Sequence, residues 1–446
     1  MLSAFGFSQE KDTVNLGYKK RVLESIEVDF LSSYYKQDGV HSSVSGGMGS
    51  ENLSDFATNI VVAVPLNDDD VLSVDAGISA YTSASSSNIN PFDKSKNNPS
   101  ATPWQASSGA SAQDVLAAMI VNYSHSSADR NLIWNADVAF SNEYDYTSIG
   151  FGGGISKLFN QKNTEISLKT NVYLDQWRPI YPKELQEFGN NNFFNGFTIY
   201  DQNGIASSNY LPSSFLSWNK NNRNSYSASF GFSQVVTQKM QFSLFFDLLQ
   251  QRGALSTPYH RIYFADKANY YIGQPQFISV YETTQNTGVY HLADAIEQLP
   301  DTRFKIPFGA RLNYYLSEKI TLRTYYRYYW DDWGITSHTA SLEIPIKISD
   351  KFTFIPTYRY YTQKESTYFA PYDKHLSTEK FYTSDYDLSS FNANQYGLGV
   401  SYTDIFTAAK ISIFGLKNID FRYNHYQRTD GLRANIVTLG VKFVQQ

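Results

Sequence analysis

The sequence has no cysteine among its 446 residues. Disulfide bonds, thiolate metal sites, cysteine nucleophiles and lipid attachment through cysteine are therefore excluded. The sequence also lacks a long hydrophobic run, because no window approaches the 18 apolar residues that a membrane-spanning helix needs. A net charge of -5 argues against a nucleic-acid partner. The mean hydropathy of -0.39 does not exclude a membrane protein, because a transmembrane barrel keeps a polar lumen.

Aromatic residues are abundant, with 35 Tyr and 31 Phe. Amphipathic rings prefer the interface between membrane and water, and apolar rings suit a wall that faces lipid. The composition therefore favours a barrel with aromatic girdles.

The clearest strand pattern lies at residues 320–348, ITLRTYYRYYWDDWGITSHTASLEIPIKI. Side chains alternate between an apolar and a polar row on both arms. A period of two residues indicates a β-strand with one apolar face and one solvated face. Asp332, Trp333 and Gly334 form the turn between the arms. Each arm has about ten to twelve residues, the length that crosses a bilayer at a tilt. This segment is predicted to be a transmembrane β-hairpin.

The same pattern recurs along the chain and predicts about sixteen strands. Apart from the hairpin at 320–348, we expect strands at 25–35, 56–65, 71–81, 115–125, 132–141, 149–156, 165–177, 225–235, 240–250, 304–314, 352–362, 395–402, 419–426 and 435–444. The turns NDDD, SSADRN, NQKN, TQK, SEK and DK all fall on one side, whereas the long loops fall on the other. A soluble sandwich has no reason to sort its loops in this way.

The predicted fold is all-β, a transmembrane antiparallel up-and-down β-barrel of about 16 strands with short periplasmic turns and long extracellular loops. The longer connection at 404–416 is predicted as a short interfacial helix. Residues 1–20 are predicted as a signal remnant and N-terminal extension, and residues 21–446 as a single outer-membrane barrel. The expected location is the bacterial outer membrane, with its lipid and lipopolysaccharide as partners.

Two segments carry a family resemblance. YRYYWDDWGITSHT at 326–339 and HSSVSGGMGSE at 41–51 resemble segments of the domain of unknown function 3570 family, uncharacterised bacterial outer-membrane β-barrel proteins common in Bacteroidota. The resemblance extends over most of the chain. The family has no established activity, so it implies no functional residue. Its members are often encoded near a flavin transferase, a small lipoprotein and a thioredoxin-like protein, which implies an envelope redox setting. The chain has no haem-attachment or flavinylation motif, and no cofactor is expected.

Charged residues on the predicted inward rows are sorted by half of the chain. The first half places Asp29, Asp75, Asp137, Asp175 and Asp247 inside, and the second half places Arg311, Arg323, Arg327, Arg359 and Arg422 inside. In a closed barrel the halves face each other, so this sorting predicts a transverse field across the lumen. The alternative is a set of lumenal salt bridges that only fill and stiffen the interior. Lys169 and Glu343 depart from the sorting.

The two longest loops, 178–222 and 253–302, are aromatic rather than merely hydrophilic. Their rings belong to Phe193, Phe194, Phe197, Tyr200, Tyr270, Tyr271 and Phe277. Loops of this length are usually functional or disordered, and the aromatic content argues against disorder. They are expected to form a constriction or plug, or to pack over the mouth or against an envelope protein partner.

Other motifs carry weaker signals. His41 with Ser42 and Ser43 is the best candidate for a hydrolase arrangement, and a polar loop is the simpler interpretation. Asp68, Asp69 and Asp70 lack the further spaced oxygens of a calcium loop, so a solvated turn is favoured over a Ca²⁺ site. The glycines Gly150, Gly152, Gly153 and Gly154 are expected to thin the wall beside bulky lumenal groups. No metal site is predicted.

Three functional hypotheses follow. The first is a pore for small polar solutes across the outer membrane, with an open lumen. The second is a structural or interaction component of an envelope complex, with a lumen filled by its own loops. The third is a membrane-embedded hydrolase with a His-centred cluster at the rim. The first is preferred, and an enzyme is not expected.

Overall fold

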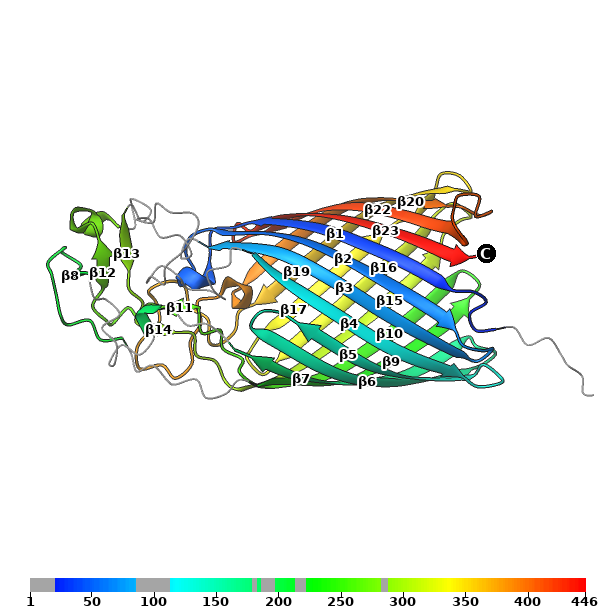
Figure 1. Cartoon of the computed structure of the whole chain (residues 1–446), viewed down its shortest axis with the longest axis horizontal. Coiled ribbons are helices and arrows are strands. Elements are labelled where there is room, and N and C mark those ends of the chain that lie inside the picture. Colours follow the sequence, from blue (N-terminus) through cyan, green and yellow to red (C-terminus); the bar gives the residue numbers. More distant parts are fainter. Residues whose placement is uncertain (1–20, 86–112, 179–182, 186–196, 213–221, 282–287) are drawn as a thin grey trace, which may run out of the picture.

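The computed structural model describes residues 21–85, 113–178, 183–185, 197–212, 222–281 and 288–446. Its main body is a closed antiparallel barrel of sixteen strands, which confirms the predicted fold (Figure 1). The first eight strands are β1 (Glu27–Asp38), β2 (Glu51–Pro65), β3 (Asp70–Ser85), β4 (Gln113–Ser126), β5 (Leu132–Asn142), β6 (Tyr146–Phe159), β7 (Thr164–Trp177) and β9 (Arg223–Thr237). The other eight are β10 (Met240–Gly253), β15 (Thr302–Tyr315), β16 (Thr321–Asp331), β17 (Thr336–Glu343), β19 (Phe352–Lys364), β20 (Phe391–Thr403), β22 (Phe414–Arg428) and β23 (Arg433–Gln445).

Each strand pairs with the next along the chain, and β1 pairs with β23 to close the sheet. The closing register places Asp29 opposite Lys442 and Tyr35 opposite Ile436. Closure satisfies the backbone hydrogen bonds of both terminal strands, which a sheet in hydrocarbon requires. The predicted transmembrane hairpin is β16 and β17, and the two-residue strand β18 (Ile346–Lys347) continues its second arm.

The predicted sorting of turns and loops is confirmed. The six short turns lie at one end of the barrel, together with the C-terminus (Figure 1). The predicted helix at 404–416 is wrong. A two-residue strand, β21 (Lys410–Ile411), pairs there with the start of β22. The Asp404 carboxylate closes this loop by accepting the backbone N–H of Ala409 at 3.0 Å, and the positive φ angles of Thr407 and Ser412 interrupt any helical run.

The ion pair between Glu343 and Arg422 identifies the inner face of the barrel. It joins β17 to β22, which are separated by β19 and β20, so both side chains point into the lumen. The register then assigns every second residue of each strand to the lumen. Large apolar side chains on the opposite rows are exposed, among them Phe56, Ile60, Ile78, Val115, Val138, Phe151, Ile166, Phe230, Phe308, Leu398 and Phe421.

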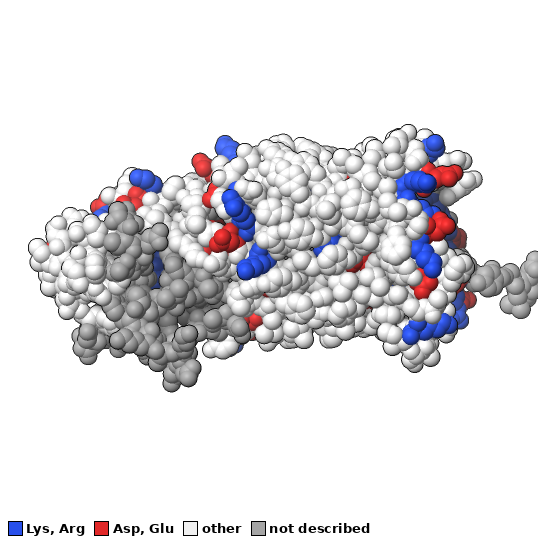
Figure 2. Space-filling view, turned by 90° about the horizontal axis from the view of Figure 1, so that it is seen from above, with Lys and Arg blue, Asp and Glu red and all other residues white. Residues whose placement is uncertain are grey.

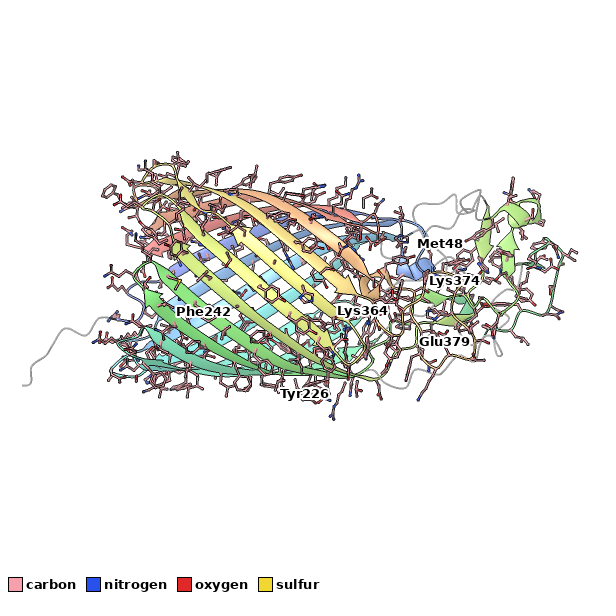
Figure 3. All side chains as sticks on the ribbon, turned by 180° about the vertical axis from the view of Figure 1, so that it is seen from behind. Met48, Tyr226, Phe242, Lys364, Lys374 and Glu379 are labelled. Carbon is pink, nitrogen blue, oxygen red and sulfur yellow. The ribbon has the colours of Figure 1, made fainter. Side chains whose placement is uncertain are left out.

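The outer surface has the layering of a membrane barrel. Figure 2 shows a broad band nearly free of charged residues between a belt of charge at the short-turn end and a second belt beside the loops. Tyr226 and Phe242 stand on this outer wall, towards opposite ends of the barrel (Figure 3). A lipid-facing apolar band flanked by interfacial groups is the architecture of an outer-membrane barrel. His338 lies on this outer row, as predicted, with Nδ1 2.8 Å from the Tyr326 hydroxyl.

The inner glycines of β6 make room for lumenal side chains, as predicted. A β-carbon at Gly150 would stand 2.6 Å from the Tyr173 ring, and one at Gly152 would stand 2.6 Å from the amide oxygen of Asn171. Gly309 on β15 has the same role for Phe245, whose ring stacks on Tyr325 with centroids 5.7 Å apart.

Beyond the barrel mouth the described parts of four loops fold together. We call this assembly the cap; it comprises residues 39–50, 183–185, 197–212, 254–281, 288–301 and 365–390. It contains a three-stranded sheet of β8 (Ile199–Asp201), β12 (Tyr270–Gly273) and β13 (Val289–His291), and a pair of β11 (Arg261–Ile262) and β14 (Ala295–Ile296). Its 3-10 helices are η1 (Ser43–Ser45), η3 (Lys183–Leu185), η4 (Pro275–Val280) and η5 (Tyr386–Leu388). None of the helices in the described parts of the chain is long and apolar enough to cross a membrane.

We expect Gly309→Ala to destabilise the barrel by about 1–3 kcal/mol, the usual cost of overpacking. The new β-carbon would overlap the Phe245 ring and stand 2.7 Å from the backbone oxygen of Tyr326. The measurement is the temperature at which the folded form disappears on unheated SDS gels. Gly153→Ala is the control, because Gly153 faces outward and its nearest heavy atom would be 3.2 Å away. Equal midpoints for the two variants would contradict the crowding.

Candidate functional site

The ten charged residues that the sequence singled out all lie on inward rows. Asp29, Asp75, Asp137, Asp175 and Asp247 lie on β1, β3, β5, β7 and β10, and Arg311, Arg323, Arg327, Arg359 and Arg422 on β15, β16, β19 and β22. The strand order around the barrel therefore puts the aspartates on one arc of the wall and the arginines on the other. Whether this arrangement acts on a solute stays a prediction.

The arginine arc contains its own counter-ions. Glu343 accepts from Arg323 at 2.7 Å and from Arg422 at 2.8 Å, and Arg422 also pairs with Asp420 at 2.7 Å. Arg311 instead lies over the rings of Phe245 and Tyr325. The Nε atom of Arg327 is buried without a hydrogen-bond partner among the described residues. Only some of the arginines are neutralised by salt bridges, so neither of the two alternatives describes the whole arc.

Three of the inward aspartates have partners of two kinds, a neutral hydroxyl for Asp175 and lysine ammonium groups for Asp137 and Asp29. Asp175 accepts from the Ser148 hydroxyl at 2.6 Å, and Asp137 is 3.8 Å from the ammonium of Lys169, the residue that departs from the sorting. Asp29 lies where β1 pairs with β23 to close the barrel, and its carboxylate is 3.4 Å from the Lys442 ammonium. The two arcs thus meet where β1 pairs with β23.

A cavity of about 580 Å³ occupies this meeting point inside the barrel. Its charged lining consists of Asp29, Asp420, Arg422 and Lys442, and the remainder is small or neutral, including Ser33, Asn59 and Thr438. Acidic and basic groups therefore line the same cavity, together with the apolar residues Leu31, Leu439 and Val441.

The cap has a hydrophobic core of its own. Tyr271, Ile278 and Val289 are buried together with Tyr200 and Phe277 packed against them, and Tyr210, Ile272, Tyr290 and Leu292 form a second cluster. Of the predicted alternatives for the aromatic loop residues, packing over the mouth is the one observed, since β8, β12 and β13 lie outside the barrel (Figure 1). Phe193 and Phe194 lie outside the described residues.

A buried ion pair crosses the cap. The Arg261 guanidinium, fully buried, pairs with Glu184 and donates to the backbone oxygen of Val44 at 3.0 Å. The residues come from three different loops, so this pair ties the loop at 39–50 to the rest of the cap. The ion pair fixes how the loops are arranged but adds little net stability, because the cost of desolvating two buried charges offsets much of their attraction.

Two titratable groups in the cap core have opposite shifts. Burial lowers the pKa of His291 to about 3, and its ring is stacked on Tyr263 and Tyr271. Burial raises the pKa of Asp294 to about 6, against the backbone N–H of Phe264 that its carboxylate accepts. Both shifts favour the neutral form.

A second cavity, of about 560 Å³, lies where the cap meets the barrel mouth. The barrel contributes Tyr35, Gln37, Leu53, Tyr426 and Arg428 to its wall. The cap contributes His41, Ser43, His260, Asp385 and Asp387. This cavity is lined by histidine and serine residues from different loops, whose proximity could not be predicted from the sequence.

His41 is not the histidine that reaches a serine hydroxyl in the described structure. Its ring stacks on Tyr386 and its Nδ1 is 3.0 Å from the backbone oxygen of Gly47. The Ser43 hydroxyl is instead 3.0 Å from Nε2 of His260, whose Nδ1 is 3.4 Å from a carboxylate oxygen of Glu297. In the described structure His260, and not His41, therefore lies beside the Ser43 hydroxyl, and the hydrolase hypothesis stays a prediction.

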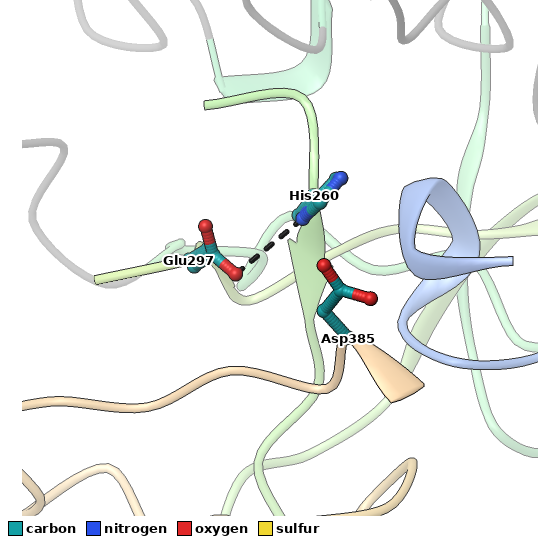
Figure 4. Close-up of side chains that lie close together, drawn as sticks. All are labelled: His260, Glu297 and Asp385. Carbon is teal, nitrogen blue, oxygen red and sulfur yellow. Dashed lines mark hydrogen bonds and ion pairs between the residues drawn. The ribbon is translucent and has the colours of Figure 1, made fainter. Parts of the chain in front are cut away.

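Asp385 joins this group from a fourth segment of the chain. Figure 4 shows its carboxylate beside the His260 ring, with Glu297 on the other side. One ligand atom from each of His260, Glu297 and Asp385 lies within 4.8 Å of the other two. Burial raises the pKa of Asp385 to about 7, with the carboxylate of Asp387 as a second cause. Sequence reasoning missed this cluster, because four residues spread over 340 positions show no spacing signal.

The acidic turn at the short-turn end is not arranged for a cation. Asp68 pairs with Arg21 at 2.9 Å, Asp69 with Arg130, and Asp70 with His125 at 2.6 Å. Each carboxylate thus has a basic partner, in line with the preference for a turn over a Ca²⁺ site.

Comparison with known proteins gives one family and distant structures. A family model described as "Protein of unknown function (DUF3570)" matches residues 1–436. None of the curated proteins matches the chain.

Similar solved structures include a "Bacterial polysaccharide outer membrane secretin", with 9% identity, a TM-score of 0.42 and coverage of 95% of this chain and 98% of that chain. A "TodX deltaS2S3 mutant monoaromatic hydrocarbon channel" has 10% identity, a TM-score of 0.40 and coverage of 95% and 90%. A "Pseudomonas aeruginosa FadL homologue" has 10% identity, a TM-score of 0.38 and the same coverage. At these scores the similarities carry no functional argument.

The cap should loosen in acid through His291. Its folded pKa of about 3 is below the unfolded value near 6.5, so its contribution to stability is complete above pH 6.5 and is lost as the pH falls towards 3. Asp294 acts in the opposite sense, since its stabilising effect is lost as the pH rises from 3.8 to about 6. The measurement is the rate of amide hydrogen exchange in β12 and β13, corrected for the intrinsic rate at each pH. We expect exchange to be faster at pH 4.5 than at pH 7 in the wild type. The increase should be smaller in His291→Gln. Identical pH dependence in the two proteins would contradict a neutral buried His291.

Proposed function

Starting from the fact that the chain belongs to the family described as "Protein of unknown function (DUF3570)", we propose that it is an outer-membrane channel for small polar solutes, with the cap over its extracellular mouth. The architecture of an outer-membrane barrel supports the location. The family description assigns no activity, so the proposal rests on the lumen.

The observation that carries the proposal is the lumenal cavity between Asp29, Asp420, Arg422 and Lys442. These charged groups are held in ion pairs, Asp29 with Lys442 and Asp420 with Arg422, so both signs of charge border the same internal space. Elsewhere on the wall, the inner row of β9 consists of small residues, Ser225, Ser227, Ser229, Gly231 and Ser233. A wall of this kind leaves room for water and for hydrated solutes, and a barrel of sixteen strands is wide enough for an aqueous channel.

The charge arcs give the channel a means of selecting solutes. Fixed charges on a narrow wall attract ions of opposite sign and orient dipoles. Arg311, Arg327 and Arg359 contribute most directly, because none of them forms a salt bridge within the described residues, whereas Arg323 and Arg422 share Glu343. A zwitterionic or dipolar solute would face acid on one side and arginine on the other.

A second candidate function is an interaction component of an envelope complex. The cap has a hydrophobic core, but two apolar side chains in the segment after β8 are exposed to solvent. Ile205 is 63% exposed and Leu211 is 74% exposed. Exposed apolar groups on a folded extracellular surface favour contact with another protein. This function and a channel are compatible, but only the channel requires an open lumen.

Single-channel recording in a planar bilayer tests the channel. We expect stable conductance steps from the refolded protein that increase with salt concentration. We expect Arg327→Gln combined with Arg311→Gln to shift the reversal potential in a KCl gradient towards greater cation selectivity, because two fixed positive charges leave the lumen. Lys162→Gln combined with Lys239→Gln, in the exposed turns between β6 and β7 and between β9 and β10, is the charge-matched control and should leave the reversal potential near the wild-type value.

If protein that is folded on unheated SDS gels gives no conductance steps, the result would contradict the channel proposal and favour the interaction component. Conductance without a selectivity shift in the double variant would contradict the role of the arginine arc.

A further inference from the structure

We propose that His260, Glu297 and Asp385 form a binding site for one divalent first-row transition-metal ion where the cap meets the barrel mouth. The channel proposal does not depend on this site, and the site does not depend on conduction. Its ligands would be one imidazole and two carboxylates, a nitrogen and oxygen set that suits Zn²⁺, Mn²⁺ or Fe²⁺.

The first argument is convergence. The three ligand atoms come from different segments and lie within 4.8 Å of one another. Ligands bound to one ion at about 2.0–2.2 Å are separated from each other by roughly 3.0–4.4 Å. The 3.4 Å between Nδ1 of His260 and Oε1 of Glu297 falls in this range, whereas it is long for a strong hydrogen bond between the same atoms. The limit of 4.8 Å for all three pairs, Asp385 included, is close to the upper end of this range.

The second argument is charge. Glu297 is 3% exposed and shares its surroundings with the carboxylate of Asp385. The nearby guanidinium of Arg428 is paired with Asp387 and Asp430, and Arg261 is paired with Glu184. Within the described part of the chain, the His260 imidazole lies within 4.8 Å of an oxygen of each of the two carboxylates. Burying two carboxylates against one imidazole is unfavourable, and a divalent cation would neutralise them.

The third argument is that every ligand is already oriented by a neighbour. Nε2 of His260 is 3.0 Å from the Ser43 hydroxyl, which leaves Nδ1 for the metal. Glu297 accepts the Thr383 hydroxyl and the backbone N–H of Thr257, and Asp385 accepts the backbone N–H of Asp387 at 3.0 Å. Hydrogen bonds of this kind fix the tautomer and direction of metal ligands.

The same geometry places Ser43, His260 and Glu297 in the order of a hydrolase triad. A triad requires one acid on the histidine, and it leaves the second carboxylate at Asp385 unexplained. The metal site uses both carboxylates and gives Ser43 a supporting role. It also accounts for the position of the site, because a metal bound there would join the loops at 254–301 and 365–390 over the mouth, and the loop at 39–50 contacts the ligand His260 through Ser43. His260 and Asp385 line the 560 Å³ cavity, so open coordination positions would face a space that solutes can enter.

Isothermal titration of the untagged, refolded full-length protein tests the site, after removal of metal with EDTA. We expect ZnCl₂ and MnCl₂ each to bind with a stoichiometry of one. His260→Gln and Asp385→Asn should each weaken binding by more than about 100-fold. Ser43→Ala should weaken it by about 10-fold or more, because outer hydrogen-bond partners usually affect metal affinity by 10–100-fold.

His125→Gln is the matched control and should leave the affinity within about twofold. His125 is also paired with a carboxylate, Asp70, at 2.6 Å, but it lies beside the turn between β2 and β3 at the other end of the barrel. Folding of each variant is checked on unheated SDS gels. Should His260→Gln fail to fold, electron spin-echo measurements on Mn²⁺ bound to the wild type replace it, and a coupling to one imidazole nitrogen is expected.

Three results would overturn the proposal. The first is the absence of stoichiometric binding by folded wild-type protein. The second is an affinity unchanged in folded His260→Gln and Asp385→Asn, or bound Mn²⁺ without a nitrogen coupling. The third is labelling of Ser43 by a fluorophosphonate probe in metal-stripped protein that does not bind metal, which would assign the cluster to a serine hydrolase instead.

Discussion

The hydrogen bonds of the backbone determine the architecture of this protein. In hydrocarbon an unpaired N–H or carbonyl group is too costly to expose, so a sheet in the membrane must close on itself. The pairing of β1 with β23 meets this requirement. Closure in turn gives each strand one lipid face and one lumenal face, and the alternation of apolar and polar residues follows from it. The charged arcs of the lumen are a consequence of the same alternation.

The cap follows a different rule. Its buried residues form compact clusters, such as Leu255, Leu299 and Trp333, whereas the large apolar side chains of the barrel lie on its outer surface. Trp333 belongs to the β16–β17 turn, and its indole N–H donates to the backbone oxygen of Thr302. The cap therefore rests on the barrel rim through a core contact and not only through polar loops. The polar cluster around His260 lies at this same junction, where a change in the position of the cap would alter access to the lumen.

The sequence was sufficient to predict the barrel, because period-two alternation and turn chemistry are local signals. They placed the ten inward charges on the correct face and the short turns at one end. Strand ends were less accurate. β2 begins at Glu51, whereas the apolar pattern begins at Phe56, since pairing with β1 and β3 extends the strand into polar sequence. The helix predicted at 404–416 was wrong, because the backbone N–H of Ala409 donates to the Asp404 carboxylate and two positive φ angles determine the course of this loop.

The cap and its polar cluster could not be predicted from the sequence in the same way. Ser43, His260, Glu297 and Asp385 are brought together by packing between loops, and neither periodicity nor spacing records such contacts. The aromatic content of the loops indicated that they fold, but not against what. Arg261 and Glu184, 77 residues apart, illustrate the point, since each looks like an ordinary surface residue in the sequence and both are fully buried.

Cysteine accessibility tests the central claim, that alternate residues of the wall face a water-filled lumen. The chain has no cysteine, so single substitutions report on one position each. In β9, Ser227 and Ser229 face the lumen and Ala228 faces lipid. We predict that Ser227→Cys and Ser229→Cys react with a charged, membrane-impermeant methanethiosulfonate in the folded protein, and that Ala228→Cys does not, because a thiol in lipid does not ionise readily. Equal reactivity at all three positions, or reaction at Ala228→Cys alone, would contradict the account.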